Sequence, residues 1–93
     1  MNLTKEQLEK VKELAYRTMT AGVIANVLEV DEVDFMDEVC TPGTLARRAF
    51  LQGTLQQMLE TREAIIKAAR NGSNPAQAEL LRFLDKQIRS CRV

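Results

Sequence analysis

Apolar residues recur along the chain every three or four positions, which is the spacing of amphipathic helices. The first such stripe follows Thr4, which forms a capping box with Gln7, so the sequence predicts a helix over about 4–18. The same spacing predicts two shorter helices, over about 20–28 and about 32–40. No segment shows the apolar–polar alternation of a strand, so the expected fold class is all-α.

The second part of the chain predicts two longer helices. Thr41-Pro42-Gly43 interrupts the helical pattern, and the next helix is predicted over 44–70, with Gly53 as its only breaker. The last helix is predicted over about 75–91, with Asn74 as its N-cap. Its apolar stripe consists of Leu80, Leu81, Leu84, Ile88 and Cys91.

The short loop between the last two helices predicts that they run antiparallel. The expected organisation is a small three-helix unit at 1–43, followed by a long antiparallel helical hairpin at 44–93. Gly53 lies in the middle of the long helix, where glycine costs about 1 kcal/mol relative to alanine. We therefore expect a neighbouring helix to approach closely at this position.

The stretch VIANVLEVDEVDFMDEV at 23–39 has the apolar spacing of a helix-turn-helix. The small Ala25 would let the two helices cross closely, and Val30 would fill the turn. Glu29 replaces the glycine that is usual in this turn, which predicts a strained or altered backbone conformation there. Asp31 is a good N-cap for the helix that follows.

The second helix of this pair is acidic. It carries Glu32, Asp34, Asp37 and Glu38 and no Lys or Arg, whereas bases and phosphates are contacted mainly by Arg, Lys, Asn and Gln. We therefore do not expect it to read bases. The candidate DNA-binding residues are Arg47, Arg48, Arg17, Lys12 and Lys5. For Arg47 and Arg48 the alternative role is to partner the acidic helix, within the chain or between copies.

The long helix has apolar residues around more of its circumference than one shorter partner helix covers. Two interpretations are open: the first three helices cover the remainder, or the hairpin is an oligomerisation surface. We favour a homo-oligomer. The candidate interface residues are Phe50, Leu51, Leu55, Met58, Leu59, Ile65, Ile66 and Phe83.

The net charge is zero, but the two halves of the chain differ in sign. Residues 1–43 contain four Lys or Arg and nine Asp or Glu, a net charge of −5, and residues 44–93 contain nine and four, a net charge of +5. This distribution favours head-to-tail association of copies, or a basic face for polyanions. The alternative is that the two halves neutralise each other within one chain.

The composition argues against an enzyme. The chain has no histidine and no glycine-rich phosphate loop. Its two cysteines, Cys40 and Cys91, are far apart in the sequence, and we expect them to be small buried or half-buried thiols. We expect no catalytic residue, no cofactor, no metal site and no small-molecule substrate. The charged N-terminus is unlike a signal peptide, and no apolar run is long enough to span a bilayer, so we expect a cytoplasmic protein without membrane contact.

Two short motifs support a family resemblance. The segment AARNGSNPAQAELLRFLDK at 68–86 resembles the A-x-x-G-N-…-L-x-x-L-K stretch of bacteriophage terminase small subunits, and AFLQG at 49–53 is similar to a pattern in their preceding helix. The resemblance covers about 20–86. It implies an N-terminal helix-turn-helix, a helical hairpin that assembles subunits into a ring, and recognition of viral double-stranded DNA for packaging by a terminase large subunit. The small subunit is not itself a nuclease.

Two other functions remain open at this point. The chain could be a helix-turn-helix transcriptional regulator that binds operator DNA as a dimer. It could also be a protein–protein interaction module whose acidic third helix docks on a basic partner or mimics DNA. The three functions predict different observations. The terminase-like protein should form a large closed assembly, the regulator should form a dimer, and the interaction module should bind no DNA at low salt.

Overall fold

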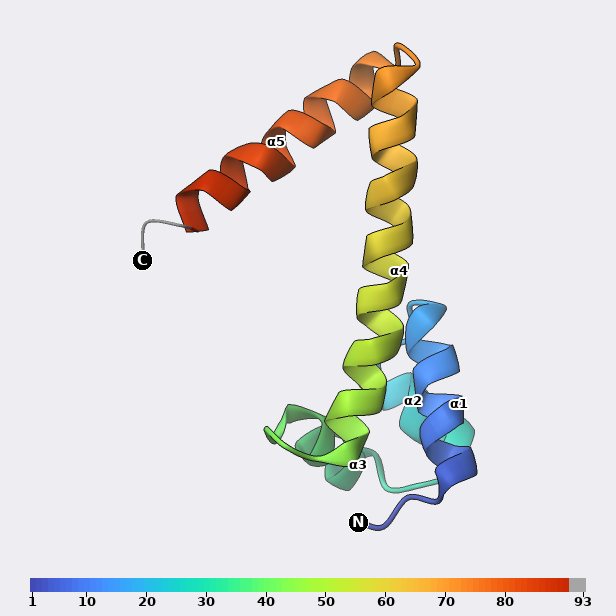
Figure 1. Ribbon diagram of the computed structural model, residues 1–93. Coiled ribbons are helices and arrows are strands. Elements are labelled where there is room, and N and C mark those ends of the chain that lie inside the picture. Colours follow the sequence, from blue (N-terminus) through green and yellow to red (C-terminus); the bar gives the residue numbers. More distant parts are fainter. Residues whose placement is uncertain (91–93) are drawn as a thin grey trace. The chain divides into compact units, whose positions relative to one another are not determined.

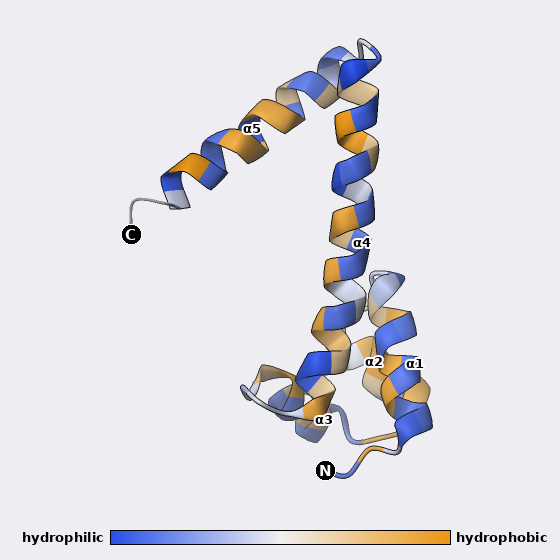
Figure 2. Cartoon of the chain, viewed as in Figure 1, coloured by the Kyte–Doolittle hydropathy of each residue, from blue (hydrophilic) through white to orange (hydrophobic). Residues whose placement is uncertain are grey.

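The computed structural model describes residues 1–90. Its helices are α1 (Lys5–Tyr16), α2 (Ala21–Leu28), α3 (Glu32–Cys40), α4 (Leu45–Arg70) and α5 (Asn74–Ser90) (Figure 1). No strand is present among residues 1–90, so the predicted all-α class is confirmed. Hydrophobic and hydrophilic residues alternate in bands along the helices, as expected for amphipathic helices (Figure 2). Cys40 is exposed, so the expectation of a buried or half-buried thiol is wrong at this position. Cys91 lies outside the described residues.

The chain divides into two compact units, Met1–Met58 and Leu59–Val93. The division falls within α4 and not at the predicted position between residues 43 and 44. The reason is that Ala46 and Ala49, near the start of α4, are buried in the same core as α1, α2 and α3. The first unit therefore contains the first three helices together with the N-terminal half of α4.

The core of the first unit is aliphatic apart from one aromatic side chain, Phe35. Its three largest fully buried side chains are Val11, Ile24 and Phe35, one each from α1, α2 and α3. No polar or charged side chain is buried in the part of the chain that the structure describes. This core fixes how α1, α2 and α3 pack within the first unit.

The helix starts follow the capping signals of the sequence in the first unit. Thr4 and Gln7 form both hydrogen bonds of the predicted capping box, at 3.1 and 2.8 Å. The Asp31 carboxylate accepts a hydrogen bond from the backbone N–H of Asp34 at 2.9 Å, so the predicted N-cap of α3 is confirmed.

The start of α5 differs from the prediction by one residue. The Ser73 hydroxyl accepts a hydrogen bond from the backbone N–H of Ala76 at 3.3 Å, which makes Ser73 the N-cap in place of Asn74. Pro75 then occupies the second helical position, where its missing N–H still costs nothing. Gln77 does not complete a capping box but donates to the carbonyl of Ala69, near the end of α4, at 2.9 Å.

In the second unit, a short turn joins the C-terminal part of α4 to α5. Gly72 has φ of 96°, the left-handed conformation in which helices commonly end. Beyond the turn, α5 diverges from this part of α4 (Figure 1), and none of its residues is buried. The short connection was therefore predicted correctly, whereas a closely packed antiparallel hairpin is not confirmed.

Candidate functional site

The α2–α3 pair is tightly packed around a three-residue turn. Ile24, Ala25 and Phe35 have no solvent-exposed surface, which is consistent with the close approach expected at Ala25. Glu29 has φ of 58° and ψ of 39°, so the altered turn conformation predicted there is confirmed. The backbone N–H of Val30 donates to the carbonyl of Ala25 at 3.0 Å, and Val30 packs partly buried against the core.

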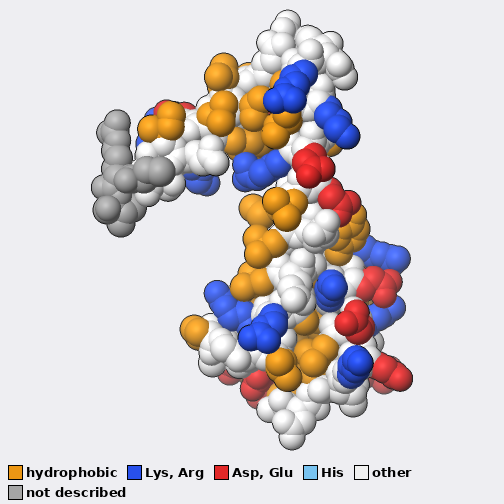
Figure 3. All heavy atoms as spheres, viewed as in Figure 1, with side chains coloured by type: hydrophobic (Ala, Val, Ile, Leu, Met, Phe, Trp, Pro, Cys, Tyr) orange, Lys and Arg blue, Asp and Glu red, His pale blue; other side chains and the backbone are white. Residues whose placement is uncertain are grey.

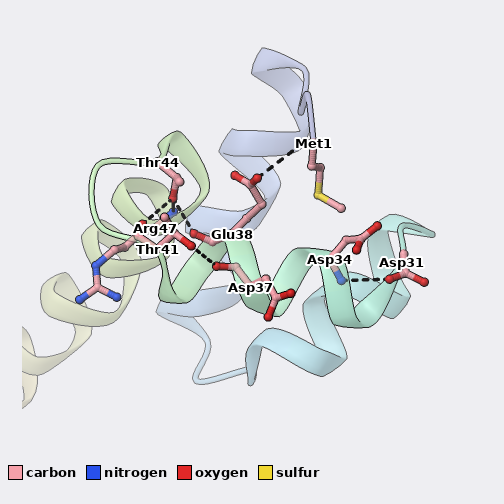
Figure 4. Close-up of polar contacts among 8 residues, drawn as sticks. All are labelled: Met1, Asp31, Asp34, Asp37, Glu38, Thr41, Thr44 and Arg47. Atoms are coloured by element: carbon pink, nitrogen blue, oxygen red, sulfur yellow. Dashed lines mark hydrogen bonds and ion pairs between the residues drawn. The ribbon is translucent and has the colours of Figure 1, made fainter.

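The outward face of α3 is both acidic and apolar. Val33 is 67% exposed and Met36 is 43% exposed, and the neighbouring Asp34 and Asp37 are exposed as well. In Figure 4 the side chains of both aspartates extend from the helix without an ion-pair partner among the residues drawn. This face offers no cation to a phosphate, so the acidic helix remains unsuited to reading DNA.

The C-terminal end of α3 is attached to the start of α4. The Thr44 hydroxyl donates to the carbonyl of Glu38 at 2.6 Å (Figure 4). The Arg47 guanidinium donates through Nη1 to the carbonyl of Val39 at 3.0 Å. A cation at a helix C-terminus also interacts favourably with the helix dipole. Arg47 therefore has an intrachain partner on the acidic helix, which is one of the alternatives left open by the sequence.

The N-terminal ammonium group of Met1 also contacts the acidic helix. It lies 3.5 Å from the Glu38 carboxylate, which is only partly exposed. Glu32 lies beside α2, where its carboxylate is 3.5 Å from the Asn26 amide nitrogen. Two of the four carboxylates of α3 thus have partners within the first unit, whereas Asp34 and Asp37 face solvent.

The remaining predicted DNA-binding cations lie on two helices of the first unit. Arg48 is exposed at the start of α4, and with Arg47 it lines a shallow hollow. Lys5 and Lys12 are exposed on α1, and Arg17, just after α1, is 3.2 Å from Glu13. On the face shown in Figure 3, Lys and Arg side chains of the first unit are interspersed with Asp and Glu. The structure therefore brings Arg47 and Arg48 together but does not gather all five cations into one basic patch.

Three of the eight predicted oligomerisation residues are exposed. Leu55, Met58 and Leu59 are 50%, 45% and 59% exposed. Phe50 packs against the core of the first unit, so part of its apolar surface is covered there. The others are partly buried: Leu51, Ile65, Ile66 and Phe83.

Sequence reasoning missed a groove within the second unit. Its apolar wall includes Ile66 of α4 and Leu80, Phe83 and Leu84 of α5. Two cations, Arg62 and Lys86, also line it. Two of its residues, Ile66 and Phe83, are among the predicted interface residues, which is the only signal of this groove in the sequence.

Arg62 is the residue that organises this groove. Its guanidinium carbon lies 3.9 Å from the centre of the Phe83 ring, a cation–π contact between α4 and α5. No ion pair is formed by Arg62 or Lys86 within residues 1–90. The groove therefore combines the exposed Leu84 and three partly buried apolar side chains with two cations that have no carboxylate partner within residues 1–90.

The described residues contain no group of three or more His, Cys, Asp or Glu placed to hold a metal ion. None of the helices from α1 to α5 is long and apolar enough to cross a membrane. Comparison with protein-family models, with curated proteins and with solved structures finds no match to this chain.

Proposed function

We propose that this protein is a non-enzymatic, DNA-binding homo-oligomer of the terminase small subunit type, which recognises viral double-stranded DNA for packaging by a large subunit. The observation that carries the proposal is the α2–turn–α3 pair, with Ile24, Ala25 and Phe35 fully buried and Glu29 in the left-handed turn. This is the packing that a helix-turn-helix requires. Uncovered apolar residues on α3, α4 and α5 supply surface for assembly.

Because the outward face of α3 is acidic, we propose that other elements of the first unit contact DNA. Arg48 is the strongest candidate because it is exposed and has no ion-pair partner in the described chain. Lys5 and Lys12 on α1 are further candidates, although Lys12 lies beside Glu9 and Glu13. Each such contact is weak, but several copies in one assembly would multiply it by avidity.

The test is the binding of a fluorescent DNA duplex to the oligomeric protein between about 50 and 200 mM salt. The affinity should fall steeply with salt, and Arg48→Ala should reduce the slope of log affinity against log salt by about 1 for each Arg48 that contacts a phosphate. Arg89→Ala is the matched control, because it removes the same charge from α5, where Arg89 pairs with Asp85 at 2.7 Å. It should leave the slope unchanged. Absence of binding at the lowest salt, or equal slopes for the two variants, would contradict the DNA-binding proposal.

One observation favours a second candidate function, a protein–protein interaction module. Val33 and Met36 are exposed on α3 between carboxylates, which suits a basic, partly apolar partner better than a duplex. This candidate predicts no DNA binding in any oligomeric state, so the same titration separates it from the first proposal.

A further inference from the structure

Two uncovered surfaces of this chain are complementary in charge and in apolar character. The first is the outward face of α3, which we call the α3 face and define as Val33, Asp34, Met36 and Asp37. These side chains are exposed. The opposite side of the helix is buried, and Thr44 and Arg47 hold the C-terminal end of α3, so this face is fixed toward solvent in the first unit.

The second surface is the groove of the second unit, which we call the α4–α5 groove and define as Arg62, Ile66, Leu80, Phe83, Leu84 and Lys86. Leu84 is 44% exposed, and the cations lack carboxylate partners within residues 1–90. In Figure 3 hydrophobic side chains gather over α5 and the adjoining part of α4, with Lys and Arg beside them. An apolar groove with a basic rim is the complement of an apolar helix face with acidic flanks.

We infer that the α3 face of one copy docks in the α4–α5 groove of a second copy, as a helix in a groove. The inference rests on the homo-oligomer of the proposed function and names the surfaces that build it. Val33 and Met36 would bury against Ile66, Leu80 and Leu84, while Asp34 and Asp37 would meet Arg62 and Lys86. Such a contact combines apolar burial at its centre with ion pairs at its rim.

The groove is long enough to hold the α3 face. Val33 to Asp37 rise about 6 Å along the axis of α3, and Leu80 to Lys86 extend about 9 Å along α5. Opposite charges would also orient the approach of two copies, because the acidic residues lie mostly in the first half of the chain and the basic ones mostly in the second.

The contact joins two different surfaces, so it is heterologous and each copy can use both surfaces at once. Repetition of such a contact builds a ring if the rotation closes and a filament if it does not. This is the head-to-tail association that the charge distribution favours, and it leaves Arg48, at the start of α4, outside the contact.

The test is a charge swap read by light scattering after size exclusion. Asp34→Lys/Asp37→Lys and Arg62→Glu/Lys86→Glu should each reduce the mass to that of one chain, 10.5 kDa, because both docking surfaces then have like charge. An equimolar mixture of the two variants should recover the assembly, since each then supplies the surface that the other lacks. The chain with all four substitutions should also assemble. Glu6→Lys/Glu9→Lys on α1 is the matched control and should keep the wild-type mass.

The outcomes separate the docking from the proposed function. If the wild-type chain is oligomeric and the folded charge-swap variants keep its mass, the docking is overturned while the proposed oligomer stands. If the variants become monomeric but neither the mixture nor the fourfold variant recovers, the pairing is also overturned. If the wild-type chain is monomeric, the proposed assembly itself fails. Should a lysine variant fail to fold by circular dichroism, Asp34→Asn/Asp37→Asn replaces it, and an unchanged mass at low protein concentration then overturns the docking.

Discussion

Gly53 is the residue at which the packing of the first unit leaves no room for a side chain. A Cβ atom built there would overlap the backbone carbonyl oxygen of Lys12 and lie 2.9 Å from the backbone nitrogen of Tyr16. The closeness brings α1 and α4 together, and the Gln57 amide then donates to the carbonyl of Tyr16 at 2.9 Å. The packing gain explains a glycine in mid-helix.

Gly53→Ala should therefore destabilise the protein, by about 1–3 kcal/mol, because backbone atoms of α1 must move to admit the methyl group. Thermal unfolding should show a clear fall in Tm. Gly22→Ala is the matched control, since that helical glycine faces only the flexible end of the Glu32 side chain. The control should be neutral or stabilising by up to about 1 kcal/mol. Equal Tm values for the two variants would contradict the close approach at Gly53.

At this scale the sequence was informative wherever a residue type conflicts with its local pattern. A glycine inside a long helix predicted a close helix contact, and a glutamate at a turn that favours glycine predicted the backbone conformation of Glu29. The N-cap of α5 was misplaced because Ser73 and Asn74 are both good caps. Local preference alone does not choose between adjacent capping residues.

At the scale of the elements, α3 is held at both ends by polar contacts and along one side by the core. Asp31 caps its N-terminus, and Thr44 and Arg47 bind carbonyls near its C-terminus. The helix is only nine residues long, a length that is marginal in isolation, so these contacts matter for its stability. Arg47 thus has a structural role whether or not it also contacts DNA.

Arg47→Met should cost about 1 kcal/mol of unfolding free energy, because it keeps the aliphatic stem and removes the charged donor to the Val39 carbonyl. Arg48→Met is the matched control. Arg48 is exposed, so this substitution should change the free energy of unfolding by less than about 0.5 kcal/mol. Denaturant unfolding monitored by circular dichroism measures both. If Arg48→Met lowers the free energy of unfolding as much as Arg47→Met does, the structural role of Arg47 is contradicted.

The elements themselves were predictable, but their packing was not. Periodicity and breakers located the helices to within a few residues, because those signals are local. Whether α5 lies closely against α4 depends on what covers its apolar stripe, and Leu81 and Ile88 are 66% and 62% exposed. The short loop restricts how the chain turns, yet it does not supply the contacts that would close a hairpin.

At the scale of the whole molecule, several large apolar side chains among residues 1–90 are exposed to solvent. Leaving such surface in water is costly, at about 25 cal/mol for each Å² of apolar area that could be buried. The surfaces that remain open belong to both units, and they are acidic on α3 and basic in the α4–α5 groove. Self-association is the arrangement that covers both with a single kind of partner.

The candidate site could be predicted from the sequence only in part. The apolar excess of the long helix and the opposite charges of the two halves are visible in the sequence, and both favour oligomers. The α4–α5 groove is not visible there, because it depends on Arg62 and Phe83 meeting across a turn. Nor does the sequence show that Arg47 is bound to α3 whereas Arg48 is exposed.

The mass of the wild-type protein in solution, measured by light scattering after size exclusion, shows whether the chain assembles head to tail. A homo-oligomer built by head-to-tail contacts should give a single species well above a dimer of 10.5 kDa chains, and the mass should persist on dilution if the assembly is closed. A dimer would contradict the closed assembly and agree with an operator-binding regulator. A mass of one chain would contradict self-assembly altogether.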